Sequence, residues 1–200
     1  MQFTMLSILL ALITFILGCA GSKPIMLEET TSDGQVRYSV IVKGRDKIKI
    51  NEGLYTAWYP NGTKKTEVNY VGGLKQGTEL FWDAFGIKLR ETKYDNGLKQ
   101  GKETHWDTRG RLKREVMYLN DLQEGPEITY DTAGNKIKEE FYTQGVKNGT
   151  ETGYDEMGRK IYESQYLNGK KNGTESFYDY SAGNVPTVTV IQWIQGEVAP

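Results

Sequence analysis

The sequence is short of the residues on which many catalytic and metal sites depend. Its 200 residues include one cysteine, Cys19, and one histidine, His105. A single cysteine excludes an internal disulfide and a cysteine-based metal cluster. With one histidine and no phosphate-binding loop or G-x-S-x-G motif, we expect no zinc site, no histidine-based triad and no cofactor. The sequence therefore predicts a protein that is not an enzyme.

The chain also lacks an excess of charge and a large apolar fraction. Its 25 basic and 26 acidic residues give a net charge of -1, so we expect no nucleic acid among its partners. Apolar residues make up 38% of the chain and its mean hydropathy is -0.58, which is lean for a core between two layers. The 12% of aromatic residues is too high for a disordered chain. We therefore expect a thin, ordered structure with a large surface.

The one long apolar run lies at the N-terminus, where residues 1–18 contain no charged side chain. Its length is typical of a secretory signal and short for a membrane span. The residues Ile16, Leu17, Gly18 and Cys19 resemble a bacterial lipobox. The resemblance implies that residues 1–18 are a lipoprotein signal peptide and that Cys19 carries a diacylglycerol. An uncleaved anchor and ordinary secretion are the alternatives.

A lipoprotein of this kind would be anchored by its lipid in the cell membrane or the outer membrane, with the rest of the chain outside the cytoplasm. Residues 19–33 are polar apart from a short run near Ile25, and we expect them to form a tether.

From residue 53 the chain repeats itself every 24 residues. The copies begin at glycines 53, 77, 101, 125, 149 and 173, and the sixth residue of each copy is aromatic. These six aromatic residues are Trp58, Trp82, Trp106, Tyr130, Tyr154 and Tyr178. An aspartate follows in all but the first copy, and a second glycine, a glutamate and a tyrosine recur after it. A fixed period of this length indicates a repeat architecture.

Each copy contains two short β-rich runs separated by glycine-bearing turns, which is typical of a β-hairpin. The predicted fold is all-β: an elongated, single-layer antiparallel β-meander of about six 24-residue hairpin repeats over residues 53–178. Residues 34–52 and 179–200 depart from the pattern, and we interpret them as a degenerate N-terminal cap hairpin and a C-terminal cap, because the ends of a repeat array must be shielded.

The charges predict a register. If Asn61 and Gly62 form a two-residue turn, the equivalent pairing in the next copy places Trp82 opposite Leu89 and Asp83 opposite Lys88. If Asn96 and Gly97 also turn the chain, the pairs are Tyr94 with Lys99, Arg90 with Glu103, Arg114 with Glu127 and Lys138 with Glu151. Opposite charges facing each other across strands would each stabilise the sheet slightly.

In this register the six aromatic residues form a continuous ribbon on one face, and Tyr94 and its equivalents lie on the other face. We expect the ribbon to be the candidate surface for binding a partner, because interfaces favour exposed aromatic residues with charged rims. The alternative is that the rings only pack on their neighbours. The recurring aspartates are expected to cap turn backbone rather than catalyse or bind metal.

The pattern G-x-E-x-x-[WY]-D-x-x-G, followed by E-x-x-Y-x-x-G, over residues 53–178 resembles the bacterial variant of the MORN (membrane occupation and recognition nexus) repeat family. A weaker likeness is to the YD repeats of large secreted shell proteins. The MORN resemblance implies a scaffold that binds other molecules, and some members of the variant family are labelled antitoxins. The leading expectation is a non-catalytic envelope lipoprotein that binds a protein partner. The alternatives are an antitoxin or immunity protein that blocks a toxin, and a protein that binds cell-wall glycan.

Overall fold

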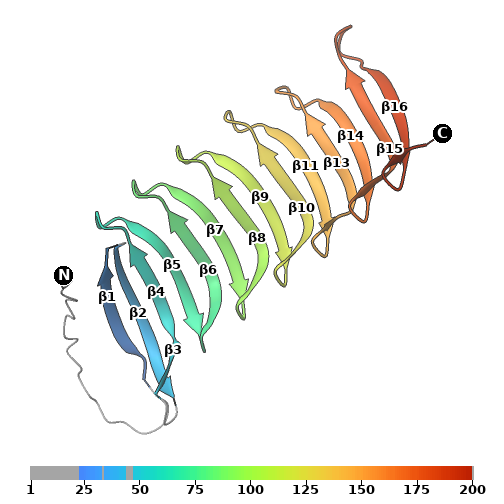
Figure 1. Ribbon diagram of the computed structural model, residues 1–200. Coiled ribbons are helices and arrows are strands. Elements are labelled where there is room, and N and C mark those ends of the chain that lie inside the picture. The colour runs from blue at the N-terminus through green and yellow to red at the C-terminus, as the bar shows by residue number, and fades with distance from the viewer. Residues whose placement is uncertain (1–22, 33, 44–46, 200) are drawn as a thin grey trace, which may run out of the picture.

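The computed structural model describes residues 23–32, 34–43 and 47–199 and confirms the predicted fold class. Seventeen strands form one open antiparallel sheet, in which hairpins follow one another along the length of the molecule (Figure 1). None of the described residues belongs to a helix long and apolar enough to cross a membrane. The predicted signal peptide, Cys19 and residues 44–46 of the cap hairpin lie outside the described residues.

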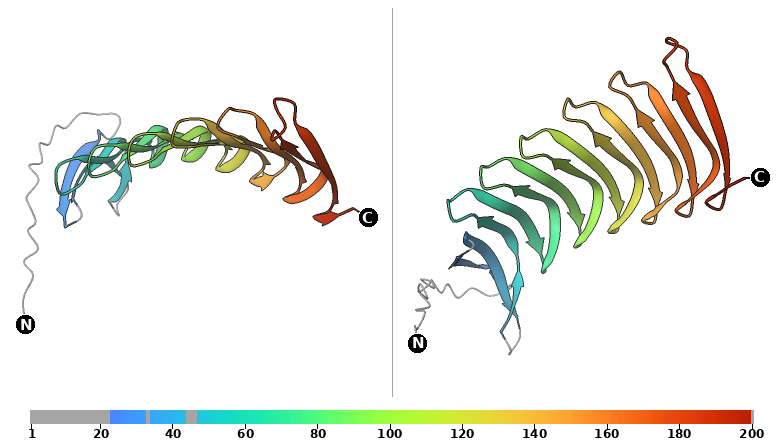
Figure 2. Two further views of the ribbon diagram at one scale, coloured as in Figure 1. Left: turned by 90° about the horizontal axis from the view of Figure 1, so that it is seen from above. Right: turned by 45° about the horizontal axis from the view of Figure 1, so that its top comes forward.

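Most strands have eight or nine residues, and all paired strands run antiparallel. Their bounds are β1 Ile25–Thr31, β2 Gly34–Lys43, β3 Ile48–Asn51, β4 Gly53–Trp58, β5 Lys64–Val71, β6 Leu74–Trp82, β7 Lys88–Asp95, β8 Leu98–Trp106, β9 Leu112–Leu119, β10 Leu122–Tyr130, β11 Lys136–Thr143, β12 Val146–Lys147, β13 Gly149–Tyr154, β14 Lys160–Leu167, β15 Lys170–Asp179, β16 Thr187–Ile194 and β17 Glu197–Val198. Seen from above, the sheet is one layer thick and twists along its length (Figure 2).

The N-terminal end of the sheet contains one strand more than expected. Ile25–Thr31 forms β1, which pairs with β2 over its whole length, so this part of residues 19–33 is a strand and not a tether. On its other side β2 pairs with β3 and then with β4. The hairpin expected over residues 34–52 is therefore β2 and β3, and β1 is the N-terminal edge of the sheet.

Five-residue turns join the two strands of the first five repeats at the upper edge in Figure 1, and we call the four that begin with an aspartate the Asp turns. In the turn from Asp83 to Ile87, the N–H of Gly86 donates to the carbonyl of Asp83, and one Asp83 carboxylate oxygen accepts from the N–H groups of Phe85 and Ile87. Asp107, Asp131 and Asp155 accept in the same way. The expectation that these aspartates cap turn backbone is confirmed.

Two-residue turns join successive repeats at the opposite edge. Asn96 and Gly97 have φ angles of 49° and 85°, and the other such turns also have two positive values, which suits the right-handed twist of a hairpin. Each turn is fixed to the previous repeat: Gly97 N–H donates to the Lys75 carbonyl, and Asn96 N–H to the Gln76 side chain. Equivalent bonds recur in the neighbouring turns, so each repeat positions the next.

The register expected at the Asp turns is right for the body of the hairpin and wrong at its end. Gly77 to Phe81 pair as predicted, but Trp82 lies opposite Lys88 rather than Leu89 because a β-bulge adds one residue to β7. Asp83 therefore faces no lysine across the strands and closes the five-residue turn instead. The bulge recurs at Trp58, Trp106, Tyr130 and Tyr154.

The register expected at the two-residue turns is right next to the turn and wrong further along. Tyr94 pairs with Lys99 as predicted, whereas Arg90 lies opposite His105 and not Glu103. The same shift places Arg114 opposite Thr129 and Lys138 opposite Gly153. Around the repeat glycine of this pairing, Gly101, three residues of β8 lie opposite one residue of β7. Strand β8 thus has two extra residues, and because this number is even, each side chain stays on its predicted face.

The two faces differ in what they bury. The face with Tyr94, which we call the glutamate face, buries glutamates in the repeats that begin at glycines 77, 101, 125 and 173, together with small apolar or hydroxyl side chains. The buried residues there are Val40, Ala57, Val68, Glu79, Thr92, Glu103, Val116, Glu127, Glu140, Ser164 and Glu175. The opposite face, the ribbon face, carries the six aromatic residues and buries Thr56, Thr104 and Thr152. A single layer with this few apolar residues depends on polar contacts for its order.

Candidate functional site

The six predicted ribbon residues lie at or next to the ends of their strands, on one face, as the sequence predicts. Trp58, Trp82, Trp106, Tyr130 and Tyr154 end β4, β6, β8, β10 and β13, and Tyr178 is the penultimate residue of β15. All six are half-buried. The structure thus brings the candidate residues into one row but leaves only part of each ring open to a partner.

Cations from the preceding repeat cover several of these rings. The Nζ atom of Lys64 lies 5.3 Å from the ring centre of Trp82, and that of Lys88 lies 4.1 Å from the ring centre of Trp106. Lys136 lies 4.4 Å from Tyr154 in the same way. Each such contact contributes about 0.5–1 kcal/mol at an exposed site. The rings therefore stabilise the stacking of repeats, whatever else they bind.

The ring of Tyr130 differs from those of Trp58, Trp82, Trp106 and Tyr154. Leu112 takes the place of the lysine, and within the described residues no cation lies over this ring. The Tyr130 hydroxyl donates to Glu115 at 2.9 Å, and burial together with this hydrogen bond raises the pKa of Tyr130 to about 12. A recess of about 220 Å³ lies here, lined by Asp107, Leu112, Lys113, Tyr130, Asp131 and Thr132.

A second recess lies one repeat further along the ribbon face. It has a volume of about 500 Å³ and is lined by Asp131, Ile137, Tyr154, Asp155, Glu156, Met157 and Arg159. One oxygen of each lining aspartate already accepts backbone N–H groups of its own turn. The two recesses are open hollows between consecutive Asp turns.

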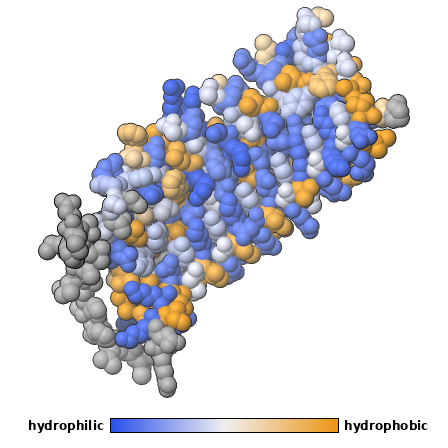
Figure 3. All heavy atoms as spheres, viewed as in Figure 1, coloured by the Kyte–Doolittle hydropathy of each residue, from blue (hydrophilic) through white to orange (hydrophobic). Residues whose placement is uncertain are grey.

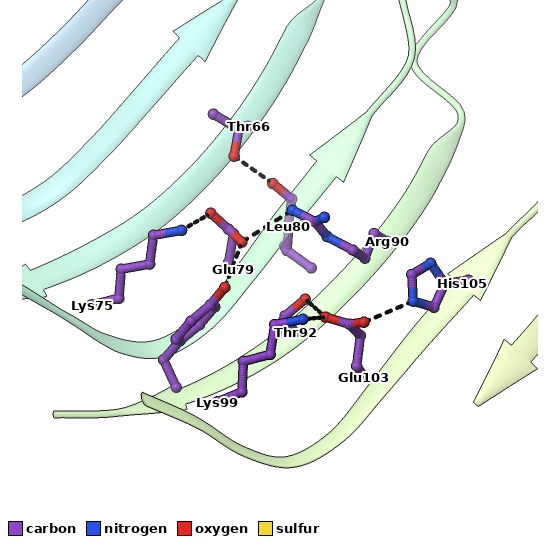
Figure 4. A network of polar contacts seen from close by, with 10 residues as sticks. Thr66, Lys75, Glu79, Leu80, Arg90, Thr92, Lys99, Glu103 and His105 are labelled. Atoms are coloured by element: carbon purple, nitrogen blue, oxygen red, sulfur yellow. Dashed lines mark hydrogen bonds and ion pairs between the residues drawn. The ribbon is translucent and has the colours of Figure 1, made fainter. Parts of the chain in front are cut away.

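On the glutamate face, each repeat after the first builds a polar cluster around one buried or half-buried glutamate, as Figure 4 shows for Glu79 and Glu103. Glu79 accepts from Lys75 at 2.5 Å and from Arg90 and Tyr94 at 3.3 Å each. One repeat later, Glu103 accepts from Lys99 at 2.7 Å and from Thr92 at 2.8 Å, and it bonds His105 at 2.8 Å. The single histidine is therefore part of this network.

Glu103 is ionised in this network although it is only 3% exposed. Burial opposes its ionisation, but the hydrogen bonds from His105, Lys99 and Thr92 outweigh burial and lower its pKa to about 2. The lysines also link repeats, since Lys75 lies over Tyr94 and Lys99 over Tyr118, 4.7 and 4.5 Å from the ring centres. Each lysine ends one repeat and contacts both a glutamate and a ring of the following repeat.

The cluster around Glu127 departs from this arrangement. Gln123 stands where the other repeats have a lysine, and it donates to Glu127 at 2.7 Å. Glu127 lies directly opposite Glu140 on β11, and the two are 9% and 6% exposed. The equivalent partners in other repeats are uncharged, for example Thr92 and Ser164. Arg114 reaches Glu127 at 3.3 Å, and Lys138 and Lys147 reach Glu140 at 2.8 and 2.7 Å.

A row of exposed aliphatic residues along the two-residue turns was missed by the sequence analysis. Leu74, Leu98, Leu122 and Val146 follow successive turns and are 41–50% exposed. Three of these side chains lie close to the glycine of the following turn: Leu74 to Gly97, Leu122 to Gly145 and Val146 to Gly169. Figure 3 shows hydrophobic residues along this lower edge and at the C-terminal end of the molecule. The signal was present in the sequence as an aliphatic residue at the same place in four copies.

The described residues contain no group of three or more histidine, cysteine, aspartate or glutamate side chains placed to hold a metal ion. The aspartates of the Asp turns are committed to their turns, and hydrogen bonds from Arg111 lower the pKa of Asp107 to about 2. No family model matches the chain, and a search of curated proteins found no match either.

The first prediction concerns pH. Glu103→Gln is expected to lower the free energy of unfolding near neutral pH by about 1–3 kcal/mol, because it removes hydrogen bonds to a buried charge. Since the pKa of Glu103 falls from 4.5 to about 2 on folding, its contribution is complete above about pH 4.5 and is lost as the pH falls toward 2. Urea unfolding of both proteins across this range should show the difference shrinking. Glu156→Gln, an exposed control, should show little effect at any pH, and a constant deficit in Glu103→Gln would contradict the assignment.

The second prediction restores the missing lysine. Gln123→Lys is expected to raise the free energy of unfolding by about 0.5–1 kcal/mol, because it gives Glu127 a charge-assisted partner and places a cation near Tyr142. The reciprocal variant, Lys99→Gln, should lower it, because Glu103 loses its ammonium partner. Thermal unfolding of the two variants tests the pair. Equal shifts in the same direction would show that the lysine position does not stabilise the array.

Proposed function

We propose that the protein is a non-catalytic lipoprotein of the cell envelope whose repeat sheet binds another protein. The single observation that carries the proposal is the open single layer, in which no second layer of the described residues covers either face. Every repeat thus presents an aromatic ring and a lysine–glutamate pair. The majority of the two-residue turns also present an aliphatic side chain. A regular array of this kind suits a long binding surface better than an enclosed reaction site.

The ribbon face is the candidate binding surface. Its half-buried rings with charged neighbours have the composition that interfaces favour, and the two recesses add hollows into which partner side chains could fit. The rings also brace the stack through Lys64 and Lys88, so binding and packing share the same residues. The arrangement of hairpins is also what membership of the bacterial MORN variant family implies, and we infer that membership from the sequence pattern.

Lipid attachment at Cys19 would place the sheet close to a membrane. The first residue of β1 is Ile25, so five residues separate it from Cys19, and the six steps along the chain span at most about 20 Å when fully extended. The array would then begin at the membrane surface. A partner reached by this array would be another envelope component.

The third prediction is that the mature protein, extracted from membranes with detergent, begins at Cys19 and carries a diacylglycerol. Its intact mass is the measurement. Such a mass would direct the search for partners to the envelope and would argue against an antitoxin that works in the cytoplasm. An unmodified soluble chain that begins at Met1 would overturn the proposed localisation and would favour the antitoxin alternative.

The fourth prediction tests the ribbon. The double variant Trp82→Ala and Trp106→Ala is expected to lose binding of the envelope partner captured by the wild-type protein, while circular dichroism shows that the sheet is retained. The matched control is Phe85→Ala with Val185→Ala, which removes two apolar side chains that are 88% and 83% exposed and that line neither recess. Binding lost equally in both, or unfolding of the tryptophan variant alone, would contradict a binding role for the ribbon.

A further inference from the structure

Strand β16, at the C-terminal end of the sheet, lacks the charged side chains that β1 carries at the N-terminal end. Strand β16, Thr187–Ile194, contains no charged residue, and its eight residues are all exposed or half-buried. Val188 and Val190 are 47% and 53% exposed. Sheet edges in natural proteins are usually protected by charged side chains, bulges or prolines, because unpaired backbone groups attract other strands. An uncharged edge strand rich in β-branched residues is therefore suited to pairing with another strand.

The hairpin partner β17 leaves part of this edge unpaired. Trp193 pairs with Val198 and Ile194 with Glu197, and the Ala199 N–H donates to the Gln192 carbonyl. Because the backbone groups of an antiparallel strand alternate in direction, those of Val188 and Val190 point outward, as those of Gln192 do. No described residue pairs with them on that side.

The open part of the edge has a defined centre. Pro186 lies at one end and has no N–H to donate, and β17 covers the strand from Gln192 onward at the other end. The open window is therefore residues 187–191, and its middle residue is Thr189. The backbone groups of Thr189 point toward Phe177 of β15, because Val188 and Val190 on either side point outward.

We propose that this window pairs with the same window of a second copy of the chain, antiparallel and about a two-fold axis at Thr189. Val188 of one copy then exchanges backbone hydrogen bonds with Val190 of the other, and the two Thr189 residues face each other. The window is self-complementary, since every residue in it is uncharged and no like charges meet. Two-fold contacts of this self-complementary kind are the commonest in homo-oligomers.

The N-terminal edge does not fit the same role. Strand β1 carries Glu28 and Glu29, which bond Arg37 at 3.5 Å and Tyr38 at 2.6 Å on the adjacent strand β2. Pairing two β1 strands would bring these carboxylates together, and pairing β1 with β16 would leave them opposite uncharged residues. Growth of a chain of copies through both edges is therefore disfavoured, and the two-fold pair closes on itself.

The fifth prediction is a site-specific crosslink in the full-length protein, extracted in detergent. Thr189→Cys should form a dimer disulfide under mild oxidation, because facing residues whose backbones point apart have Cα atoms about 4.5 Å apart, within disulfide reach. Thr187→Cys is the matched control. Across the proposed axis the two residues 187 lie four positions apart along the strand, roughly 13 Å, which is too far. The unsubstituted protein controls for any link through Cys19.

Sedimentation of the uncrosslinked protein provides the second readout. The wild-type chain should show a concentration-dependent dimer that Val190→Lys abolishes, whereas Val146→Lys, a similar change at a two-residue turn, leaves the dimer intact. A monomer at every concentration would overturn the proposal. So would equal crosslinking at both positions, oligomers longer than a dimer, or a dimer that survives Val190→Lys.

Discussion

A single-layer sheet depends on the contacts between each repeat and the next, because no second layer buries either face. In this protein the decisive contacts are at the two-residue turns. The N–H of the second turn residue donates to a backbone carbonyl of the previous repeat, as Gly97 does to Lys75. The first residue donates to a side chain, as Asn96 does to Gln76. These bonds position each hairpin on the previous one, independently of the side-chain contacts on the two faces.

The polar clusters add order to this backbone frame more than they add stability. Burying a glutamate is unfavourable unless its charge is compensated, and a buried ion pair often stabilises a fold little compared with an apolar core. Glu79 and Glu103 are nevertheless retained on a face with few apolar residues. Each requires a lysine four residues earlier and donors on an adjacent strand. A hairpin shifted along its neighbour would leave these carboxylates without partners, so the clusters disfavour alternative registers.

The sequence predicts the period, the hairpins and the faces, because these follow from alternation and turn residues, which are local. It does not predict the bulge at Trp82 or the three-against-one arrangement around Gly101. The charge pattern cannot distinguish the two registers, because the observed register places opposite charges near each other just as the expected one does. The effect on the candidate site is specific: with Lys88 rather than Leu89 opposite Trp82, a lysine of each affected repeat is placed to cover the next aromatic ring. Strand β1 was missed because it lies outside the period, and its pairing with β2 depends on distant residues.

An array of identical repeats offers a partner many equivalent positions, and a partner bound to it could shift by one repeat at no cost. The middle of this array removes that freedom. Leu112 leaves the ring of Tyr130 without a cation beside a recess, and on the other face Gln123 and Glu140 change the charge around Glu127. These departures fall in two neighbouring copies, whereas the frame of turns continues unchanged through them. A partner that contacts this region would therefore be held at one position along the sheet. The uniform repeats determine the shape of the surface, and the residues that depart from the repeat determine where along it the partner binds.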